Sequence, residues 1–417
     1  MKLLWLCNMA PSCVQEKISG KAGGGLWVDH VLSDLRKENI QIRILCPGSA
    51  VAGTVDDNCS YGLYSEGAPQ IYLPELEKQF EQELKVFQPD VIHVWGTEYG
   101  HTLAMVNAAE KLGLLQHLVI SIQGLCSVYA GHYAEGVPYA VQKEFTFRDM
   151  VRKDNILQQQ EKFALRGDLE VKALQKARHV IGRTDWDKAC TEQINPQSVY
   201  HFCNETLRDA FYDGTWQYDA CKKHRIFASS CTYPIKGFHY LLEALAEVRK
   251  TYPDATLAVP GNSFLLQDVK GKLRQSSYQK YMQTLVRKYS LENCIEFLGH
   301  LGPEQMKQQF LDANVFVLPS TIENSPNSLG EAMLLGVPCV ASLSGGVATM
   351  MVHNSEGYIY QSTAPYMLAY YINRVFAMKE TAEAMGAKAK THAQKTHDPK
   401  TNLIRLLEIY QSLAEQN

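Results

Sequence analysis

The sequence lacks a long hydrophobic run, an excess of positive charge and the cysteine spacing of a zinc site. No stretch reaches the roughly 18 consecutive apolar residues of a membrane-spanning helix, so no such helix is expected. The 41 Lys and Arg residues against 44 Asp and Glu residues leave a net charge of −3. This balance disfavours nonspecific nucleic-acid binding, which depends on a positive field.

The eleven cysteines are scattered from Cys7 to Cys339, without C-x-x-C pairs or histidines at zinc spacing. Their distribution favours reduced thiols and predicts a cytoplasmic protein without a bound metal. Residues 1–7 resemble the start of a signal peptide, but the apolar run is short and no cleavage site follows. Peripheral contact with the inner face of a membrane stays open, although no basic amphipathic helix is distinct enough to predict docking.

Several catalytic signatures are also absent. The glycines within 20–25 do not fit G-x-G-x-x-G, and no H-E-x-x-H, Walker or nucleophile-elbow sequence occurs. We therefore expect no cofactor. The bare backbone of Gly24 and Gly25, between a predicted strand and a predicted helix, can still approach a ligand closely.

Short apolar runs alternate with segments of helical period, which is typical of βαβ units around a parallel sheet. Strands are predicted at 2–7, 41–46, 90–95, 117–123, 179–182 and 198–203, and again at 225–229, 256–260, 294–298, 315–319 and 338–342. Between them, apolar residues recur with helical spacing within 26–38 and 238–248. The fold class is α/β, with two Rossmann-like, doubly wound domains facing each other across a cleft.

The predicted boundaries follow from composition. Residues 1–203 form the first domain, completed by a C-terminal helix at 401–417, and residues 224–400 form the second. Residues 204–223, with mixed charges and no sustained period, are the predicted linker. The charged stretch 142–176 is interpreted as an insertion on the first domain, either a solvated helical face or part of an acceptor site.

The most informative segment runs from 318 to 338. A strand ends near Ser320, and Pro326 fits the first position of a helix that Ser325 can cap. Asn327 and Ser328 would then carry free backbone N–H groups, which together with the helix dipole make an anion site suited to phosphate. Glu331 inside the helix can accept hydrogen bonds from ribose hydroxyls, and Glu323 in the loop can reach a sugar beyond the phosphate.

This segment, with Glu323-x7-Glu331, Ser325-Pro326-Asn327 and Gly336-x-Pro338, resembles the donor site of retaining nucleotide-sugar glycosyltransferases of family 4, which have the GT-B fold. The resemblance extends over most of the C-terminal half, through 297–301, 313–320 and 344–346. It is looser in the N-terminal half, where 23–25 and 90–94 carry it.

The resemblance implies a role for each matching residue. Glu323 would contact the transferred sugar and Glu331 the ribose. The segment from Pro326 to Leu329 would hold the sugar and diphosphate, with the loop at His300 and Leu301 against the base. Lys236 would neutralise the leaving diphosphate, and a second cation expected five residues earlier is replaced by Cys231, for which Arg183 or Arg208 are candidate substitutes.

The strand at 117–123 resembles one that ends in a histidine in many relatives, but here the residue is Gln123. An amide is no useful base, although it can hydrogen-bond a sugar hydroxyl, which is compatible with front-side displacement. The candidate acceptor residues are Glu98, His101, His132 and Tyr133.

The predicted function is a retaining, metal-independent hexosyl transfer from a nucleoside diphosphate sugar to a saccharide or lipid-linked acceptor in surface polysaccharide or glycoconjugate synthesis. Two alternatives stay open. One is a sugar-nucleotide epimerase or hydrolase, and the other is a non-catalytic nucleotide-sugar-binding subunit, suggested by Cys231 and Gln123.

Overall fold

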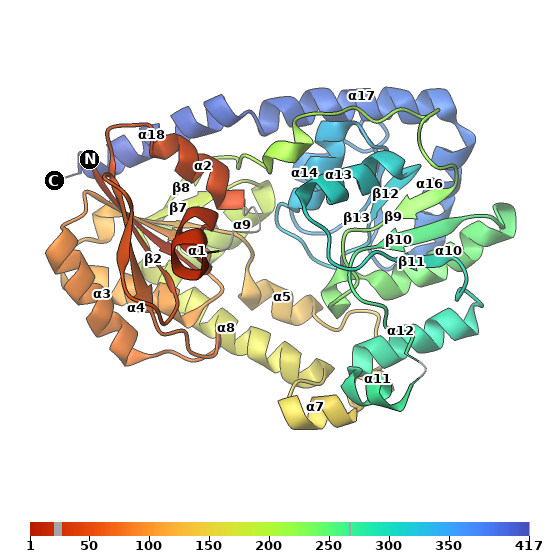
Figure 1. Ribbon diagram of the computed structural model, residues 1–417, viewed down its shortest axis with the longest axis horizontal. Coiled ribbons are helices and arrows are strands. Elements are labelled where there is room, and N and C mark those ends of the chain that lie inside the picture. The colour runs from red at the N-terminus through yellow and green to blue at the C-terminus, as the bar shows by residue number, and fades with distance from the viewer. Residues whose placement is uncertain (21–26, 267, 417) are drawn as a thin grey trace. The chain divides into compact units, whose positions relative to one another are not determined.

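The computed structural model describes residues 1–20, 27–266 and 268–416, and the chain divides into two units (Figure 1). The first unit comprises Met1–Ala130, Lys162–Arg208 and Thr396–Asn417. The second comprises Gly131–Glu161 and Asp209–Lys395. Each unit is built on its own, largely parallel sheet.

The described residues of the first unit form an eight-stranded sheet in the order β3-β4-β2-β1-β5-β6-β7-β8. All neighbours pair in parallel except β3, which runs antiparallel to β4. The central strands β1 and β5 are mostly apolar and almost entirely buried, as in parallel sheets that helices cover on both faces. The strand bounds are β1 Lys2–Cys7, β2 Gln41–Pro47, β3 Gly53–Asp56, β4 Cys59–Tyr64, β5 Val91–Trp95, β6 Leu118–Ser121, β7 His179–Gly182 and β8 Val199–Phe202.

Helices pack on this sheet through the apolar stripes expected from their spacing. In α2, Val28, Leu32 and Leu35 are buried, which confirms the predicted amphipathic helix. The helices of this part of the chain are α1 Ser12–Ser19, α2 Trp27–Leu35, α3 Pro74–Phe87, α4 Gly100–Lys111, α5 Cys126–His132, α8 Ile156–Lys176 and α9 Asp185–Ile194, with a short 3-10 turn at Leu115–His117.

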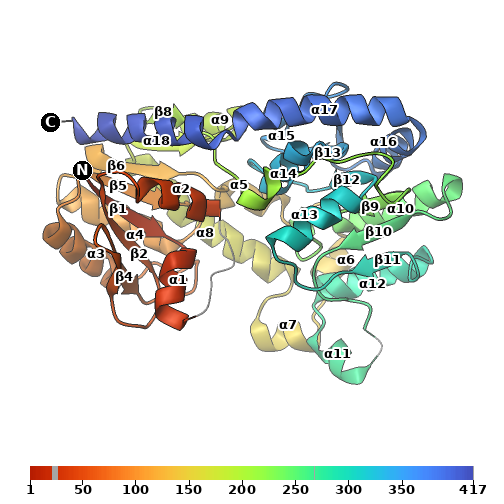
Figure 2. The same cartoon turned by 45° about the horizontal axis from the view of Figure 1, so that its top comes forward.

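The last helix, α18 (Pro399–Ala414), packs on the core of the first unit. Its Leu406, Ile409 and Leu413 are buried in the same cluster as residues of β1 and α2, and Figure 2 shows α18 running beside α2. Tyr410 at its centre is fully buried, and its hydroxyl accepts a hydrogen bond from Trp5 Nε1 at 3.1 Å. The C-terminal segment thus completes the first unit, although it follows the second in sequence.

The second unit contains a six-stranded parallel sheet in the order β11-β10-β9-β12-β13-β14. The strand order changes direction between β9 and β12, so crossover helices before and after that point cover opposite faces of the sheet. The strand bounds are β9 Arg225–Phe227, β10 Thr256–Val259, β11 Ile295–Phe297, β12 Val315–Leu318, β13 Cys339–Leu343 and β14 Tyr358–Gln361.

One helix of this unit shows how its core forms. In α10, the predicted stripe of Phe238, Leu241, Leu242, Leu245 and Val248 is fully buried, and α10 packs against α12 and α16. The helices are α6 Tyr139–Gln142, α7 Phe147–Arg152, α10 Phe238–Thr251, α11 Val269–Arg274, α12 Ser277–Lys288, α13 Pro303–Asp312, α14 Asn327–Leu335, α15 Val347–Met350, α16 Pro365–Ala377 and α17 Lys379–Thr396, with 3-10 turns at Asp209–Phe211 and Pro234–Lys236.

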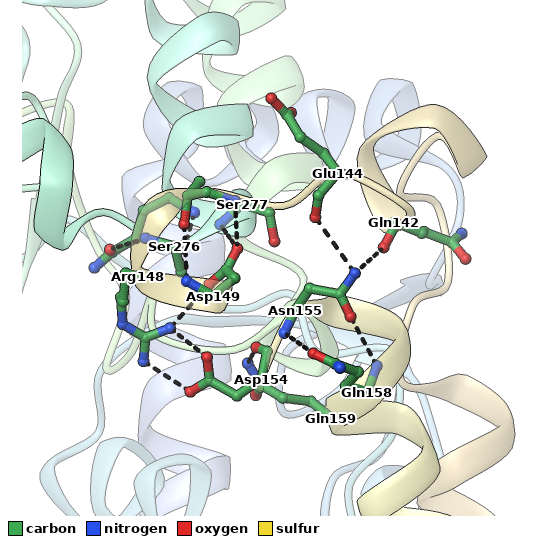
Figure 3. A network of polar contacts seen from close by, with 12 residues as sticks. Gln142, Glu144, Arg148, Asp149, Asp154, Asn155, Gln158, Gln159, Ser276 and Ser277 are labelled. Atoms are coloured by element: carbon green, nitrogen blue, oxygen red, sulfur yellow. Dashed lines mark hydrogen bonds and ion pairs between the residues drawn. The ribbon is translucent and has the colours of Figure 1, made fainter. Parts of the chain in front are cut away.

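The boundaries differ from the predicted ones in one segment before β7. Residues 131–161, expected within the first domain, belong to the second unit. The reason is polar as well as apolar packing: the buried Asp149 carboxylate accepts a hydrogen bond from Ser277 N, at the start of α12, at 2.9 Å (Figure 3). Glu144 also pairs with Lys280. The predicted insertion at 142–176 is therefore divided between the units within α8.

The predicted linker at 204–223 also differs, because its larger part packs on the second unit. Phe211 is fully buried, and Trp216 Nε1 donates to the Ala313 carbonyl at 2.7 Å. The backbone N–H of Trp216 donates to Leu335 O at 2.8 Å. These contacts assign Asp209 onward to the second unit.

No helix in the described ranges combines the length and the apolar character that crossing a bilayer requires.

Candidate active site

The candidate site lies at the carboxyl edge of the second sheet, where the strand order changes direction. Lys236 follows β9 and Glu323 follows β12, and these two strands are neighbours in the sheet. In open parallel sheets, ligands bind in the crevice at the carboxyl ends of such a strand pair. The topology therefore brings the two residues together although 87 positions separate them.

Lys236 and Glu323 form an ion pair. Lys236 Nζ lies 2.5 Å from Glu323 Oε1, and Ser320 Oγ donates to the same oxygen at 2.7 Å. The Glu323 side chain is 9% exposed and the Lys236 side chain 30% exposed. The carboxylate is thus held in place by two donors, while the ammonium group retains contact with solvent.

Two glycines let the backbone close around this pair. Gly237 has φ +62, and a Cβ there would lie 1.9 Å from Pro319 O. Gly345 has φ +48, and a Cβ would lie 1.8 Å from Glu323 O. Both positions require glycine, because of the left-handed backbone and because of the missing space. The Gly346 N–H donates to Glu323 O at 3.1 Å, which fixes the loop from the β13 side.

The helix after Glu323 begins one residue later than predicted. We expected Ser325 to cap a helix starting at Pro326, but α14 starts at Asn327, with Pro326 in the N-cap position at φ −67 and ψ 112. The Pro326 carbonyl already accepts the first helical hydrogen bonds, from the N–H groups of Leu329 and Gly330. The cap assignment to Ser325 is therefore wrong, since no side chain caps this helix.

The start of α14 nevertheless has backbone N–H groups that could bind an anion. Among the described residues, the backbone N–H groups of Asn327 and Ser328 donate no hydrogen bond. Both residues are half-buried, as is Ser325, whereas Pro326 and Leu329 are buried. Free N–H groups at the positive end of a helix dipole suit a phosphate group.

The second carboxylate of the pair lies inside this helix. Glu331 is 2% exposed, and Gly336, with φ +76, ends the helix as predicted. The two carboxylates thus occupy different elements, one in the loop before α14 and one in its second turn.

The predicted base-binding loop lies farther along the same edge. His300 is exposed and Leu301 half-buried, directly after β11. Strands β10 and β9 separate β11 from β12 in the sheet, so about 14 Å of sheet width lies between the two strands.

Cys231, where a second cation was expected, is buried, and burial raises the pKa of its thiol to about 11. Cys231 is therefore neutral at physiological pH.

Gln123 belongs to the first unit and is part of a different network. Its Nε2 donates to Glu205 Oε1 at 2.7 Å, and its Oε1 accepts from Arg183 Nη2 at 3.4 Å. Arg183 also forms an ion pair with Glu205 and donates to the Ile122 carbonyl. Arg183, a candidate replacement for the missing cation, is thus paired with Glu205 within the first unit.

The predicted acceptor residues divide between the units. Glu98 and His101 lie in the first unit, after β5 and in α4. Burial raises the pKa of Glu98 to about 7 and lowers the pKa of His101 to about 3. Glu98 Oε2 is buried and has no hydrogen-bond partner among the described residues. His101 Nδ1 lies 3.3 Å from the Tyr64 hydroxyl, so its ring is occupied in the core.

The other two acceptor candidates belong to the second unit. Tyr133 has no exposed surface, and its hydroxyl donates to Gln159, which argues against contact with an acceptor. His132 keeps an exposed ring, with Nδ1 2.8 Å from Glu135 Oε2. Its carbonyl accepts from Thr321 Oγ1 at 3.2 Å, next to the Glu323 loop. Gly24 and Gly25 lie outside the described residues.

Sequence reasoning missed the residues that support the site rather than form it. Ser320 was treated only as a strand end, yet its hydroxyl orients Glu323. Glu205 was assigned to a linker, yet it holds Gln123 and Arg183. The strand order of the second sheet, which the sequence alone does not give, shows which loops meet at the site.

The fold is GT-B-like, with two Rossmann-like domains on parallel sheets. Residues 220–392 match the family described as "Glycosyl transferases group 1". This match includes every second-unit donor residue discussed above and supports a glycosyltransferase.

Curated relatives resemble part of the chain. "Putative glycosyltransferase YtcC" from Bacillus subtilis (strain 168) is 28% identical over 198 residues, 46% of this chain and 46% of that protein. "Putative colanic acid biosynthesis glycosyltransferase WcaL" from Escherichia coli (strain K12) is 27% identical over 127 residues, 29% of this chain and 31% of that protein. The chain thus spans less than half the length of these relatives.

Solved structures resemble the whole chain in fold. Sucrose-phosphate synthase from Thermosynechococcus elongatus has a TM-score of 0.71 at 16% identity, over 99% of both chains. Anabaena Alr3699/HepE in complex with UDP-glucose has a TM-score of 0.68 at 18% identity, over 99% of this chain and 100% of that one.

Proposed function

We propose that this chain is a retaining glycosyltransferase that moves a sugar from a nucleoside diphosphate sugar to a hydroxyl group of a saccharide or lipid-linked acceptor. The observation that carries the proposal is the Lys236–Glu323 ion pair, followed in the same loop and helix start by the N–H groups of Asn327 and Ser328, which donate no hydrogen bond to any described residue. A diphosphate needs positive charge and oriented donors, and this corner of the sheet supplies both.

Each group has a task in the transfer. The Lys236 ammonium and the α14 amides would stabilise charge on the leaving diphosphate, where preorganised donors act most strongly. Glu323 and Glu331 would accept hydrogen bonds from hydroxyls of the transferred sugar and of the ribose. In this proposal no metal ion or cofactor takes part, because the Lys236 ammonium and the α14 amides would bind the phosphate oxygens.

The chemical step fits a front-side displacement. The bond from the anomeric carbon to the leaving phosphate oxygen breaks, and that oxygen takes the proton of the acceptor hydroxyl as the new glycosidic bond forms. The anomeric configuration is then retained without a covalent intermediate and without a histidine at position 123. Gln123 would position a sugar hydroxyl through its amide, which Arg183 and Glu205 orient.

Three further observations support this proposal. The match to group 1 glycosyltransferases covers the candidate donor site. WcaL is named for colanic acid biosynthesis, which favours a role in polysaccharide synthesis. HepE, with the same fold, was solved with UDP-glucose, which makes UDP-glucose a reasonable first donor.

The test is an assay of labelled nucleotide sugars with and without extracted lipid-linked saccharides. The proposal predicts nucleoside diphosphate release that depends on acceptor, and a product whose anomeric configuration, measured by NMR, equals that of the donor. Release without acceptor would indicate an epimerase or hydrolase instead. Donor binding without turnover would indicate a non-catalytic nucleotide-sugar-binding subunit.

A further inference from the structure

Helix α7, residues Phe147–Arg152 of the second unit, exposes its apolar side chains to solvent and buries an acidic one. Phe147, Met150 and Val151 share one face by their helical spacing and are 55%, 58% and 68% exposed. The opposite side carries Asp149, which is fully buried. A surface helix of a globular protein normally buries its apolar face, so this arrangement calls for a partner outside the described fold.

The exposed apolar surface continues beyond α7. Phe145, just before the helix, is 51% exposed, and Leu273 in the neighbouring helix α11 is 47% exposed. Helices α7 and α11 are in contact, and both views draw them side by side at the lower edge of the second unit (Figures 1 and 2). We call these residues, with Phe147, Met150 and Val151, the α7–α11 patch.

Basic side chains accompany the α7–α11 patch. Lys143 and Arg152 on one segment and Lys272 and Arg274 on the other are exposed. None of these four forms an ion pair within the described ranges. The segment that includes α7 and helix α11 thus each expose both apolar and positively charged side chains.

The acidic residues near the α7–α11 patch make contacts within the second unit, and of these only Asp149 is fully buried. Asp149 accepts from Ser277 N, and Asp154 accepts two hydrogen bonds from Arg148, at 2.8 and 3.0 Å (Figure 3). Glu144 pairs with Lys280, and Asp268 caps α11 by accepting from Gly271 N. Among the described residues, the exposed surface around the patch therefore carries four unpaired Lys and Arg side chains against one exposed carboxylate, Asp268, and has an excess of positive charge.

The segment is also anchored firmly enough to present this patch. Asn155 is 1% exposed, and its Nδ2 donates to the carbonyls of Gln142 and Glu144. Gln159 Nε2 donates to the Asp154 carbonyl at 2.6 Å. These bonds tie the loop before α7 to the start of α8 (Figure 3), and the contacts of Asp149 with Ser277 and of Glu144 with Lys280 hold the segment on the second unit.

We propose that the α7–α11 patch docks onto a bilayer surface that carries anionic lipids. Bulky apolar side chains enter the boundary between headgroups and acyl chains, while nearby Lys and Arg side chains bind acidic headgroups. A protein partner would have to offer acidic groups around an apolar pocket, whereas an anionic membrane supplies both features by its composition. This inference does not rest on the proposed function, because vesicle binding needs neither donor nor acceptor.

The experiment is co-sedimentation of the full chain with vesicles of phosphatidylcholine alone and of phosphatidylcholine mixed with phosphatidylglycerol. We expect binding to the mixed vesicles, weaker binding to the neutral ones, and weakening by salt. The double variant Phe147→Ser, Val151→Ser should lose at least about tenfold in partitioning. The double variant Arg152→Gln, Arg274→Gln should lose about fivefold for each charge removed.

Tyr366→Ser is the matched control, because Tyr366 is 67% exposed on α16 of the same unit. It should bind as the unchanged protein does. The proposal is overturned if the unchanged protein ignores anionic vesicles, or if the patch variants bind as well as the control. It is also overturned if light scattering shows a dimer that the Phe147→Ser, Val151→Ser variant dissociates, because the patch would then cover a second copy.

Discussion

At the scale of single residues, the side chain of Lys236 is partly exposed, whereas that of its partner Glu323 is buried. Its ammonium group touches Glu323 and still reaches solvent, so an incoming diphosphate can share it without unfolding the loop. Glu323, by contrast, keeps its Ser320 hydrogen bond whether or not Lys236 turns toward a ligand. The two residues should therefore affect catalysis more than stability.

Replacement of Lys236 by Ala should lower turnover by about 100-fold or more, because a preorganised charge on the leaving group is lost. The free energy of unfolding should fall by less than about 1 kcal/mol, as for other partly exposed ion pairs. Lys307→Ala, which breaks the ion pair with Glu304 on α13, is the matched control and should keep full activity. Equal turnover in both variants would remove Lys236 from the mechanism.

Glu98 allows a pH test at the same scale. Burial raises the pKa of its carboxyl to about 7, so the folded chain binds a proton there when the unfolded chain does not. Stability should therefore fall as pH rises from the ordinary carboxyl pKa through about 7, by at most about 3 kcal/mol.

Chemical denaturation of the unchanged protein and of Glu98→Gln at about pH 5 and about pH 8 measures this effect. The variant cannot ionise there and should gain stability relative to the unchanged protein at the higher pH. A stability difference that is the same at both pH values would show that Glu98 has an ordinary pKa.

At the scale of elements, the loops around Glu323 depend on glycine. Gly345→Ala should displace the Glu323 backbone, because its Cβ would lie 1.8 Å from Glu323 O. We expect a loss of about 2 kcal/mol or more in unfolding free energy, together with a loss of turnover. Gly302→Ala is the control, since its Cβ would find its nearest neighbour at 3.8 Å. If Gly345→Ala is as stable and active as Gly302→Ala, the close approach is absent.

Elements with strong periodicity were predictable from the sequence. The stripe of α10 is confirmed, because burial on one face of a helix acts locally. The antiparallel β3–β4 pair and β14 were missed, since their short, mixed sequences give little signal. Helix α7 lies within the charged stretch 142–176, but its orientation was not predictable, because its exposed apolar face and buried Asp149 invert the usual pattern.

At the scale of the whole molecule, the two-domain α/β fold was predictable, but the division of the chain was not. The partners of Asp149 and Glu144 lie 128 and 136 positions later in the sequence. A local sequence pattern cannot predict pairs that are so far apart. Similarly, the sequence predicted that Glu323 lies in the loop before α14. Its contact with Lys236 was not predictable, because that contact depends on the strand order of the second sheet.

The central claim is that the second unit binds a nucleoside diphosphate sugar at the carboxyl ends of β9 and β12. A thermal-shift screen of the full chain against UDP, GDP, ADP and their sugars tests it, because a ligand of the folded state raises the apparent stability. The account predicts a shift with one nucleotide series that Glu331→Ala abolishes while its own unfolding remains cooperative. The absence of a shift with every nucleotide, or an unchanged shift in Glu331→Ala, would contradict it.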